Sequence, residues 1–190
     1  MRIIVGISGA SGVVMGYEML KALRMQKDCE VHLVITHGAM ENFKYETDMD
    51  IKEVMKLADY CHDDRNLAAS ISSGSFRTDG MIVIPCSMKT VSAIASGYSA
   101  NLLVRAVDVC LKESRRVVLV PREMPLSRIH LTNLKAAADY GCIILPPMLT
   151  FYNHPTTVKE QVDHIVGKVL MQFGMEHQAF IPWEGEDSCE

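Results

Sequence analysis

The stretch MRIIVGISGASGVVMG, residues 1–16, predicts the first unit of the fold. Residues 2–7 form a short run rich in isoleucine and valine, which is typical of a buried strand. Glycines and serines follow this run, and apolar residues from Val13 onward recur at helical spacing. A strand, a glycine-serine turn and a helix N-terminus together favour an anion site, because bare backbone N–H groups and the helix dipole face the turn.

This turn differs from the dinucleotide-binding fingerprint. The pattern G-x-G-x-x-G would require glycine at Ser8 and Ser11, and no acidic residue follows the next strand, which ends at Thr36. Serine hydroxyls instead suit a terminal monophosphate such as that of FMN. The alternative is a glycine-rich connection that merely turns, and this motif alone does not decide between the two.

The composition indicates one globular domain without a specialised partner class. The chain has 190 residues, 48% hydrophobic and 22% charged, which predicts a single domain over residues 1–181 with an acidic tail at 182–190. A net charge of −4 offers no general attraction to nucleic acid, and no apolar stretch is long enough to span a bilayer. The six cysteines lack C-x-x-C spacing and the seven histidines lack H-E-x-x-H, so we expect a reduced, cytoplasmic protein without a metal.

Short apolar strands alternate with helices along the chain. This alternation predicts an α/β fold, a Rossmann-like or flavodoxin-like three-layer sandwich with a mainly parallel sheet. The polar segment 60–75 is expected to be a loop, and Pro85 is expected to end the third strand. The predicted strands are 2–7, 31–35, 81–84, 117–120 and 142–145, and the predicted helices are 11–25, 38–45, 51–58, one that begins after Ser87, 101–113, 127–140 and 157–173.

Hydroxyl groups and cations follow the predicted strands, where the ligands of such sheets bind. Lys89 falls in the first turn of a helix, where a cation is unfavourable by roughly 0.3–1 kcal/mol unless an anion lies nearby. Arg122 stands in a stiff segment between two prolines and suits a phosphate, although a salt bridge with Glu123 is the simpler interpretation. Taken singly, such residues more often have no role in a site: Tyr152 would be a core or interface tyrosine, Lys168 a solvated lysine and Trp183 a packing anchor.

Taken together, these motifs resemble the flavin prenyltransferase family, UbiX-like proteins formerly described as components of aromatic or hydroxyarylic acid decarboxylases. The resemblance covers nearly the whole chain. It is carried by GISGASGVVMG, YETD, SSGSFRTDGMIVIPCSMKT, VLVPREMPLS, PPMLTFYNHP and VGKVLMQFG, and is most specific at PCSMKT and VPREMPLS.

The resemblance implies a reaction and its partners. The enzyme would join a dimethylallyl group from dimethylallyl monophosphate to N5 and C6 of reduced FMN. The product would serve a UbiD-like decarboxylase, and a flavin reductase would supply the reduced FMN. A homododecamer built from trimers, with the site at an interface between subunits, is also implied.

The resemblance further implies roles for residues of this chain. Ser11 and Glu46 would lie near the reactive edge of the flavin, and Glu123 would act as an acid–base group. Lys168 stands where the family usually has arginine, which keeps the charge but loses the bidentate fork. FMN would be bound near Gly9, Ala10, Ser11, Thr36, Ser87, Met88, Lys89, Thr90 and Arg122, and the prenyl phosphate near Lys112, Arg122, Glu123, Tyr152 and Lys168, with Trp183 closing the pocket.

The residue inventory agrees with prenyl transfer that uses no metal. Adjacent aspartates occur only at 63–64, without the second acidic cluster that a magnesium–diphosphate site needs. A leaving phosphate would then be held by the cations Lys112, Arg122 and Lys168, while Glu123 donates a proton to it.

Two other functions stay open at this point. One is an FMN-dependent cysteine decarboxylase, but that family has a P-A-S-A-N-T-like loop and a histidine base where this chain has PCSMKT. The other is a non-catalytic, FMN-carrying accessory component of a decarboxylase complex. The presence of Glu46, Arg122, Glu123 and Tyr152 argues against a mere carrier.

Overall fold

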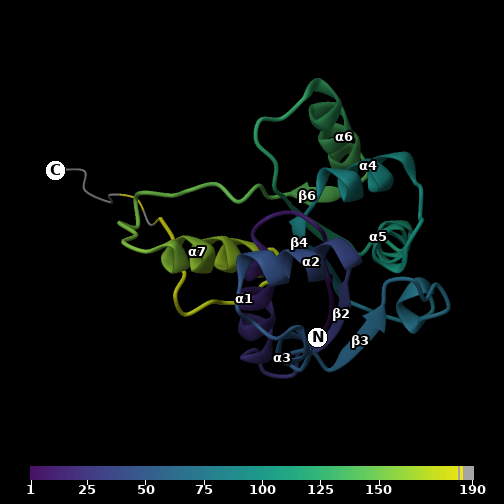
Figure 1. Cartoon of the computed structure of the whole chain (residues 1–190), viewed down its shortest axis with the longest axis horizontal. Coiled ribbons are helices and arrows are strands. Elements are labelled where there is room, and N and C mark those ends of the chain that lie inside the picture. Colours follow the sequence, from purple (N-terminus) through teal and green to yellow (C-terminus); the bar gives the residue numbers. More distant parts are fainter. Residues whose placement is uncertain (184, 186–190) are drawn as a thin grey trace.

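The computed structural model describes residues 1–183 and residue 185. In this part of the chain, six strands form one parallel sheet in the order β3-β2-β1-β4-β5-β6, with helices on both faces (Figure 1). The strands are β1 (Arg2–Ile7), β2 (Glu30–Ile35), β3 (Tyr60–Asp63), β4 (Gly80–Cys86), β5 (Arg116–Pro121) and β6 (Cys142–Ile144), and the helices are α1 (Val13–Arg24), α2 (His37–Glu46), α3 (Ile51–Met55), the 3₁₀ helix η1 (Ser70–Ser72), α4 (Met88–Ser96), α5 (Leu102–Lys112), α6 (Arg128–Asp139) and α7 (Val158–Met171).

The strand order fixes where a ligand can bind. The chain adds β2 and β3 on one side of β1, then crosses over to β4 and adds β5 and β6 on the other side. The direction of winding therefore reverses between β1 and β4. In open parallel sheets, ligands bind beyond the carboxyl ends of the strands at such a switch point.

The parallel sheet with helices on both faces confirms the predicted three-layer α/β fold.

Alternate strand residues build two cores, one on each face of the sheet. Ile3, Val5 and Ile7 of β1 pack with apolar residues of α1 and α7, whereas Ile4 packs with α4 and α5. α1 lies very close to the sheet at Gly16, where an added Cβ would be 2.7 Å from the Ile84 carbonyl oxygen. Because these strands are buried on both faces, their sequences are almost continuously apolar, which is why they could be predicted.

Two predictions about strands were wrong. Segment 60–75 is not all loop, because residues Tyr60–Asp63 form β3, which pairs with β2 at the edge of the sheet. Its sequence YCHD is polar and mostly exposed, so it carries no apolar pattern that would reveal a strand. Pro85 does not end β4, which continues to Cys86 past an irregularity in its pairing with β5 between Val83 and Cys86. A proline is tolerated at such an irregularity because the ladder there lacks a regular hydrogen bond.

Side chains cap the starts of five helices, among them the one predicted to begin after Ser87. Thr36, Ser87, Asn101, Ser127 and Thr157 each accept a backbone hydrogen bond at the start of their helices. No helix in residues 1–183 is both long and apolar enough to cross a membrane. Among the described cysteines all five are free thiols, and burial raises the pKa of Cys110 and Cys142 to about 11. Cys189 and most of the predicted acidic tail lie outside the described residues.

Candidate functional site

Ser8 connects the two strands at the switch point. It is buried, and its hydroxyl donates to the Pro85 carbonyl oxygen at 3.1 Å and accepts from the Ser87 N–H at 2.7 Å. The Thr36 N–H donates to the Ile7 carbonyl, and the Arg122 N–H donates to the Cys86 carbonyl. The segments that follow β1, β2, β4 and β5 are therefore held together at the carboxyl ends of the strands. We call the residues at 8–12, 36, 87–90 and 122 the strand-end site.

The N-terminus of α1 is occupied by a carboxylate of the protein. Oε2 of Glu46, the last residue of α2, accepts from the Gly12 N–H at 2.7 Å and from the Val13 N–H at 3.2 Å. The prediction of bare backbone N–H groups at this turn is therefore wrong for these two positions. Ser11 is exposed beside them. The structure thus brings Ser11 and Glu46 together, and it assigns the anion position of α1 to Glu46.

Among the described residues, no carboxylate accepts a hydrogen bond from the N-terminus of α4. Ser87 caps the helix, its hydroxyl accepts from the Thr90 N–H, and the two hydroxyl oxygens are 3.0 Å apart. The first turn of α4 has no acidic residue and contains the exposed Lys89. Backbone N–H groups, two hydroxyls and one cation thus gather at one helix end. This end, rather than that of α1, has the groups that a phosphate needs.

Glycine is required where the turn after β1 packs against the start of α2. An added Cβ on Gly9 would lie 3.1 Å from the Gly38 Cα, so the turn after β1 and the start of α2 are in close backbone contact. Ala10 is buried beside it. The two glycines thus let the turn after β1 pack directly against the start of α2.

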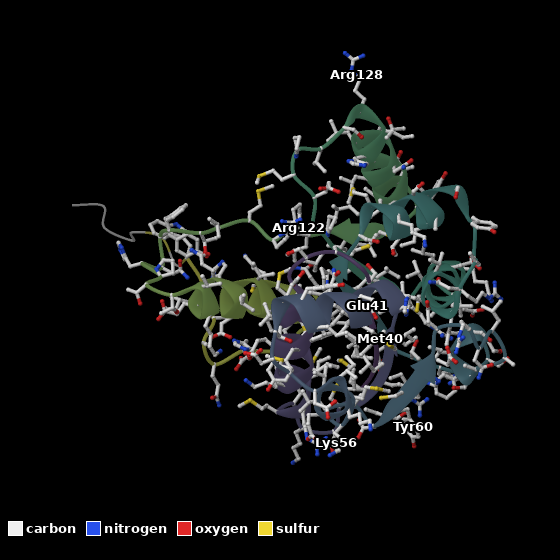
Figure 2. All side chains as sticks on the ribbon, in the orientation of Figure 1. Met40, Glu41, Lys56, Tyr60, Arg122 and Arg128 are labelled. Carbon is white, nitrogen blue, oxygen red and sulfur yellow. The ribbon has the colours of Figure 1, made fainter. Side chains whose placement is uncertain are left out.

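Arg122 and Glu123 are both exposed directly after β5. Arg122 lies near the middle of the molecule in Figure 2, whereas Arg128 projects from the outer end of α6. Glu123 Oε1 accepts from the Met124 N–H at 3.0 Å. In residues 1–183, Arg122 forms no ion pair with Glu123 or any other carboxylate. The simpler interpretation of this pair as a salt bridge is therefore wrong, and the guanidinium stays available for a ligand.

Lys112 lies at the opposite end of the strands, near their amino ends. It ends α5, just before β5 begins, forms an ion pair with Glu113, and lies beside Gly74. Arg122 follows the far end of β5, and six strand residues span roughly 17 Å. One chain therefore cannot hold a single phosphate between Lys112 and Arg122, and the hypothesis that they clamp it can apply only between two chains.

Tyr152, Lys168 and Trp183 gather around α7, beyond the edge of the sheet. The segment after β6 and the C-terminal segment both run alongside this helix (Figure 1). The ring of Tyr152 meets Trp183 edge to face at 5.6 Å, and the Lys168 ammonium lies 5.6 Å from the centre of the Phe180 ring. Three of the predicted substrate-binding residues are therefore neighbours. We call Tyr152, His164, Lys168, Phe180 and Trp183 the α7 cluster.

Sequence reasoning missed His164, the residue at the centre of the α7 cluster. Its side chain is 2% exposed, its Nε2 lies 3.3 Å from the Tyr152 hydroxyl, and its ring lies 4.9 Å from that of Phe180. Burial, together with the nearby Lys168 charge, lowers the pKa of His164. The signal was present in the sequence, because this histidine stands between Val162 and Ile165, in a stretch that the helical spacing predicts to be buried.

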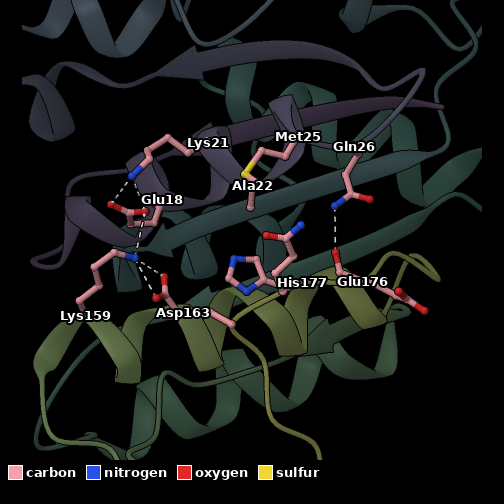
Figure 3. Close-up of a pocket in the computed structure, with 11 residues that line it drawn as sticks. Glu18, Lys21, Ala22, Met25, Gln26, Lys159, Asp163, Glu176 and His177 are labelled. Carbon is pink, nitrogen blue, oxygen red and sulfur yellow. Dashed lines mark hydrogen bonds and ion pairs between the residues drawn. The ribbon is translucent and has the colours of Figure 1, made fainter.

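A pocket of about 430 Å³ between α1 and α7 lies apart from all predicted site residues (Figure 3). Both lysines of this pocket are paired with carboxylates: Lys159 contacts Asp163 at 2.7 Å and Glu18 at 3.7 Å, and Lys21 contacts Glu18 at 3.0 Å. His177 from the C-terminal segment lies against the same pocket. With its lysines already paired, this pocket has no free cation for a phosphate.

The residues at the strand-end site fit a flavin mononucleotide. The capped N-terminus of α4 and Arg122, which forms no ion pair within the described residues, suit the phosphate. Glu46 lies across the turn from them, at the start of α1.

Comparisons with known proteins agree with this interpretation. A family model described as Flavoprotein matches residues 1–174. A probable UbiX-like flavin prenyltransferase from Sedimentibacter hydroxybenzoicus is 65% identical over 97% of this chain and 98% of its own length.

Two solved structures have the same fold over nearly the whole chain. A dodecameric FMN-dependent UbiX-like decarboxylase from Escherichia coli O157:H7 is 52% identical, with a TM-score of 0.96 over 97% of this chain and 100% of its own. AnUbiX (PadA1), solved in complex with FMN and dimethylallyl pyrophosphate, is 46% identical, with a TM-score of 0.95 over 98% of each chain.

Proposed function

Because the chain belongs to the flavoprotein family, and within it to the UbiX-like flavin prenyltransferases, we propose that it transfers a dimethylallyl group to reduced FMN. The donor is dimethylallyl monophosphate, and the acceptor atoms are N5 and C6 of the flavin. The observation that carries this proposal is the 65% identity over 97% of the chain to a protein of that name. A strand-end site supports it independently, because the helix N-terminus there has no acidic residue in its first turn and Arg122 forms no ion pair within the described residues.

Ser87, Lys89 and Thr90 hold the FMN phosphate in this proposal. The N-terminus of α4 presents N–H groups and hydroxyls toward one point, and a phosphate there offsets the cost of placing the Lys89 charge at a positive helix end. Thr36, Met88 and the backbone of Gly9 and Ala10 line the approach of the ribityl chain.

When bound, reduced FMN would supply two nucleophilic atoms. N5 would bond to the first carbon of the dimethylallyl group as the carbon–oxygen bond to phosphate breaks and N5 loses its hydrogen. C6 would bond to the third carbon as the second carbon of the double bond takes up a proton and C6 loses its own hydrogen. Arg122 then stabilises the charge on the leaving phosphate, and Glu123 donates a proton to it. Glu46, fixed by the Gly12 and Val13 N–H groups, takes up a proton at the flavin edge, and the hydroxyl of the neighbouring Ser11 orients the reacting atoms.

Lys112 takes part only if a second copy of the chain brings it to the strand-end site. The length of β5 separates it from Arg122 within one chain, as described above. The E. coli O157:H7 relative is described as dodecameric, which supports a homododecamer of trimers here, with the α7 cluster and Lys112 reaching the site of a neighbouring copy.

The proposal also specifies that the prenyl donor is a monophosphate rather than a diphosphate. AnUbiX was solved with a dimethylallyl pyrophosphate, and both donors share the prenyl group and a terminal phosphate. A diphosphate leaving group ordinarily needs a metal held by carboxylates, whereas the cations Arg122, Lys168 and Lys112 suit a monophosphate without one. A UbiD-like decarboxylase as recipient of the product, a flavin reductase and a cytoplasmic location complete the proposal.

Anaerobic incubation with reduced FMN tests the function directly. Separate samples contain dimethylallyl monophosphate, dimethylallyl diphosphate or no donor, and the released flavin is analysed by mass spectrometry. We expect the flavin to gain one C5H8 unit with the monophosphate alone. An unchanged flavin with both donors would indicate a carrier, and CO₂ release from a peptide with a C-terminal cysteine would indicate a decarboxylase.

The variant Glu123→Gln separates binding from catalysis in the same assay. This variant should bind FMN as tightly as the wild type and form product at least tenfold more slowly, because it cannot donate a proton to the leaving phosphate. Wild-type rates in Glu123→Gln would remove Glu123 from the mechanism.

A further inference from the structure

His164 lies next to a residue of the proposed prenyl-phosphate site and has no role in the function described above. It is one helical turn before Lys168 on α7, and its Nε2 is 3.3 Å from the Tyr152 hydroxyl oxygen. The two rings stand edge to face, with their centres 5.6 Å apart. His164 is 2% exposed, whereas Tyr152 is 37% exposed. The pair thus joins a buried imidazole to a phenol that reaches the surface.

The second ring nitrogen of His164 has no partner. Within the described residues, Nδ1 is buried without a hydrogen bond, as is the nearby Thr150 Oγ1. A buried polar atom without a partner costs free energy, so this histidine is a poor choice for packing alone. An aromatic residue such as phenylalanine would fill the same space against Phe180 without that cost.

The surroundings favour the neutral form of the imidazole, because burial and the Lys168 charge lower its pKa. Lys168 is the charged group that faces it from α7, Tyr152 faces it from the segment after β6, and Phe180 covers it from the C-terminal segment. A neutral imidazole has one N–H donor and one acceptor. If Nε2 bears the hydrogen, it donates to Tyr152 Oη, and the phenolic O–H of Tyr152 is then free to donate elsewhere.

We infer that His164 is a positioning residue, which orients the Tyr152 hydroxyl so that it donates to the phosphate of the prenyl donor. This inference rests on the proposed function for the identity of the ligand. Tyr152 makes the contact with the phosphate, Lys168 supplies charge beside it, and His164 acts only through Tyr152. Trp183 also meets the Tyr152 ring edge to face and restricts its movement.

The test measures binding rather than turnover. Protein loaded with oxidised FMN, which does not react, is titrated with dimethylallyl monophosphate by calorimetry. His164→Phe keeps the ring but removes both nitrogens, and we expect its Kd to rise roughly three- to tenfold, the usual effect of losing one hydrogen bond. His164→Gln keeps an N–H donor near the Nε2 position and should restore most of the affinity.

A double-mutant cycle distinguishes positioning from mere structure. Tyr152→Phe removes the hydroxyl, so adding His164→Phe to it should weaken binding no further. An equal loss in both backgrounds, or no loss in His164→Phe alone, would overturn the inference. His177→Phe is the matched control, because His177 also has a buried Nδ1 without a partner among the described residues but lies against the α1–α7 pocket of Figure 3. It should leave the Kd unchanged.

Each variant is first checked by its thermal unfolding. If His164→Phe does not fold, His164→Gln and His164→Asn replace it, and only the glutamine should retain wild-type affinity, since its amide reaches the Nε2 position. If the Kd pattern is as expected but the flavin mass never changes, the positioning role stands and the proposed transferase activity fails. If wild-type protein does not bind the prenyl phosphate at all, the inference is overturned.

Discussion

The strand-end site and the α7 cluster are built in different ways. The strand-end site is held by backbone hydrogen bonds among four strands and by a buried serine that joins two of them. The α7 cluster is held by aromatic contacts between one helix and two long segments, and much of it is open to solvent, since Trp183 is 66% exposed. The first region is complete in one chain, whereas the second has a surface that a neighbouring copy could cover.

This difference makes the strand-end site the more rigid region and the α7 cluster the more adaptable one. A phosphate that is bound at a helix N-terminus needs donors that do not move, and the sheet provides them. A prenyl donor must enter and its phosphate must leave, so the residues around it must give way. Side chains packed on a helix beyond the sheet can do this at lower cost than strand ends can.

Removal of the free arginine should have the largest effect. Arg122→Ala is expected to lower kcat/KM for prenyl transfer by about 100-fold or more, roughly 2.7 kcal/mol, because a charged donor to the leaving phosphate is lost. Arg128→Ala is the control, since Arg128 projects from the end of α6 away from the site (Figure 2). If the two variants have equal activity, Arg122 does not bind the phosphate.

Two glycine variants compare the two regions by stability. An added Cβ at Gly16 would press on the Ile84 carbonyl at 2.7 Å, inside the sheet core. Gly16→Ala should therefore destabilise the protein by about 2 kcal/mol, which lowers Tm by roughly 4–8 °C for a chain of this size. Scanning calorimetry at a fixed flavin concentration measures this change.

The matching variant lies on α7, against a member of the α7 cluster. An added Cβ at Gly167 would be 2.6 Å from the Phe180 Cγ, which belongs to the C-terminal segment rather than to the sheet. Gly167→Ala should displace that segment, alter the emission of the single tryptophan, Trp183, and change Tm by no more than about 2 °C. Equal losses of Tm in both variants would show that the cluster is as integral to the fold as the sheet.

The strand-end site could be predicted from the sequence because its residues follow apolar strands. Once residues 2–7 and 117–120 are recognised as buried strands, Ser8 and Arg122 must lie at one edge, and hydroxyl and cationic side chains there indicate an anion. The same reasoning could not show that Glu46 binds the start of α1. That contact joins positions 34 residues apart and depends on how α2 packs.

The α7 cluster was harder to predict for a physical reason. Its contacts depend on the paths of two segments without regular secondary structure, and no periodic pattern encodes such paths. Lys112 shows the opposite difficulty. Its match to the family motif is clear, but within one chain it lies at the amino ends of the strands, whereas the strand-end site lies at their carboxyl ends. Residue identity therefore predicted the parts of the site, but only the fold showed which parts one chain can assemble.

The smallest expected effect is a pH dependence that belongs to the α7 cluster alone. The pKa of His164 is lowered by burial and by the Lys168 charge, so the unfolded chain binds a proton more readily than the folded one. The contribution of this neutral histidine is therefore fully present above the unfolded pKa of about 6.5 and declines as the pH falls through that value. The pKa values of His62 and His177 are also lowered, so protonation of all three histidines should reduce the stability of the wild type as the pH falls.

Urea unfolding at pH 7.5 and at pH 5.5 isolates the share of His164. The free energy of unfolding should fall less between these two values in His164→Phe than in the wild type, because the variant has no group there to protonate. His130→Phe serves as the control, since His130 lies on α6 and its ring accepts from the Ser127 N–H at the helix start. A pH-dependent loss as large in His164→Phe as in the wild type would mean that the imidazole is already solvated, and the α7 cluster would then be as open at His164 as it is at Trp183.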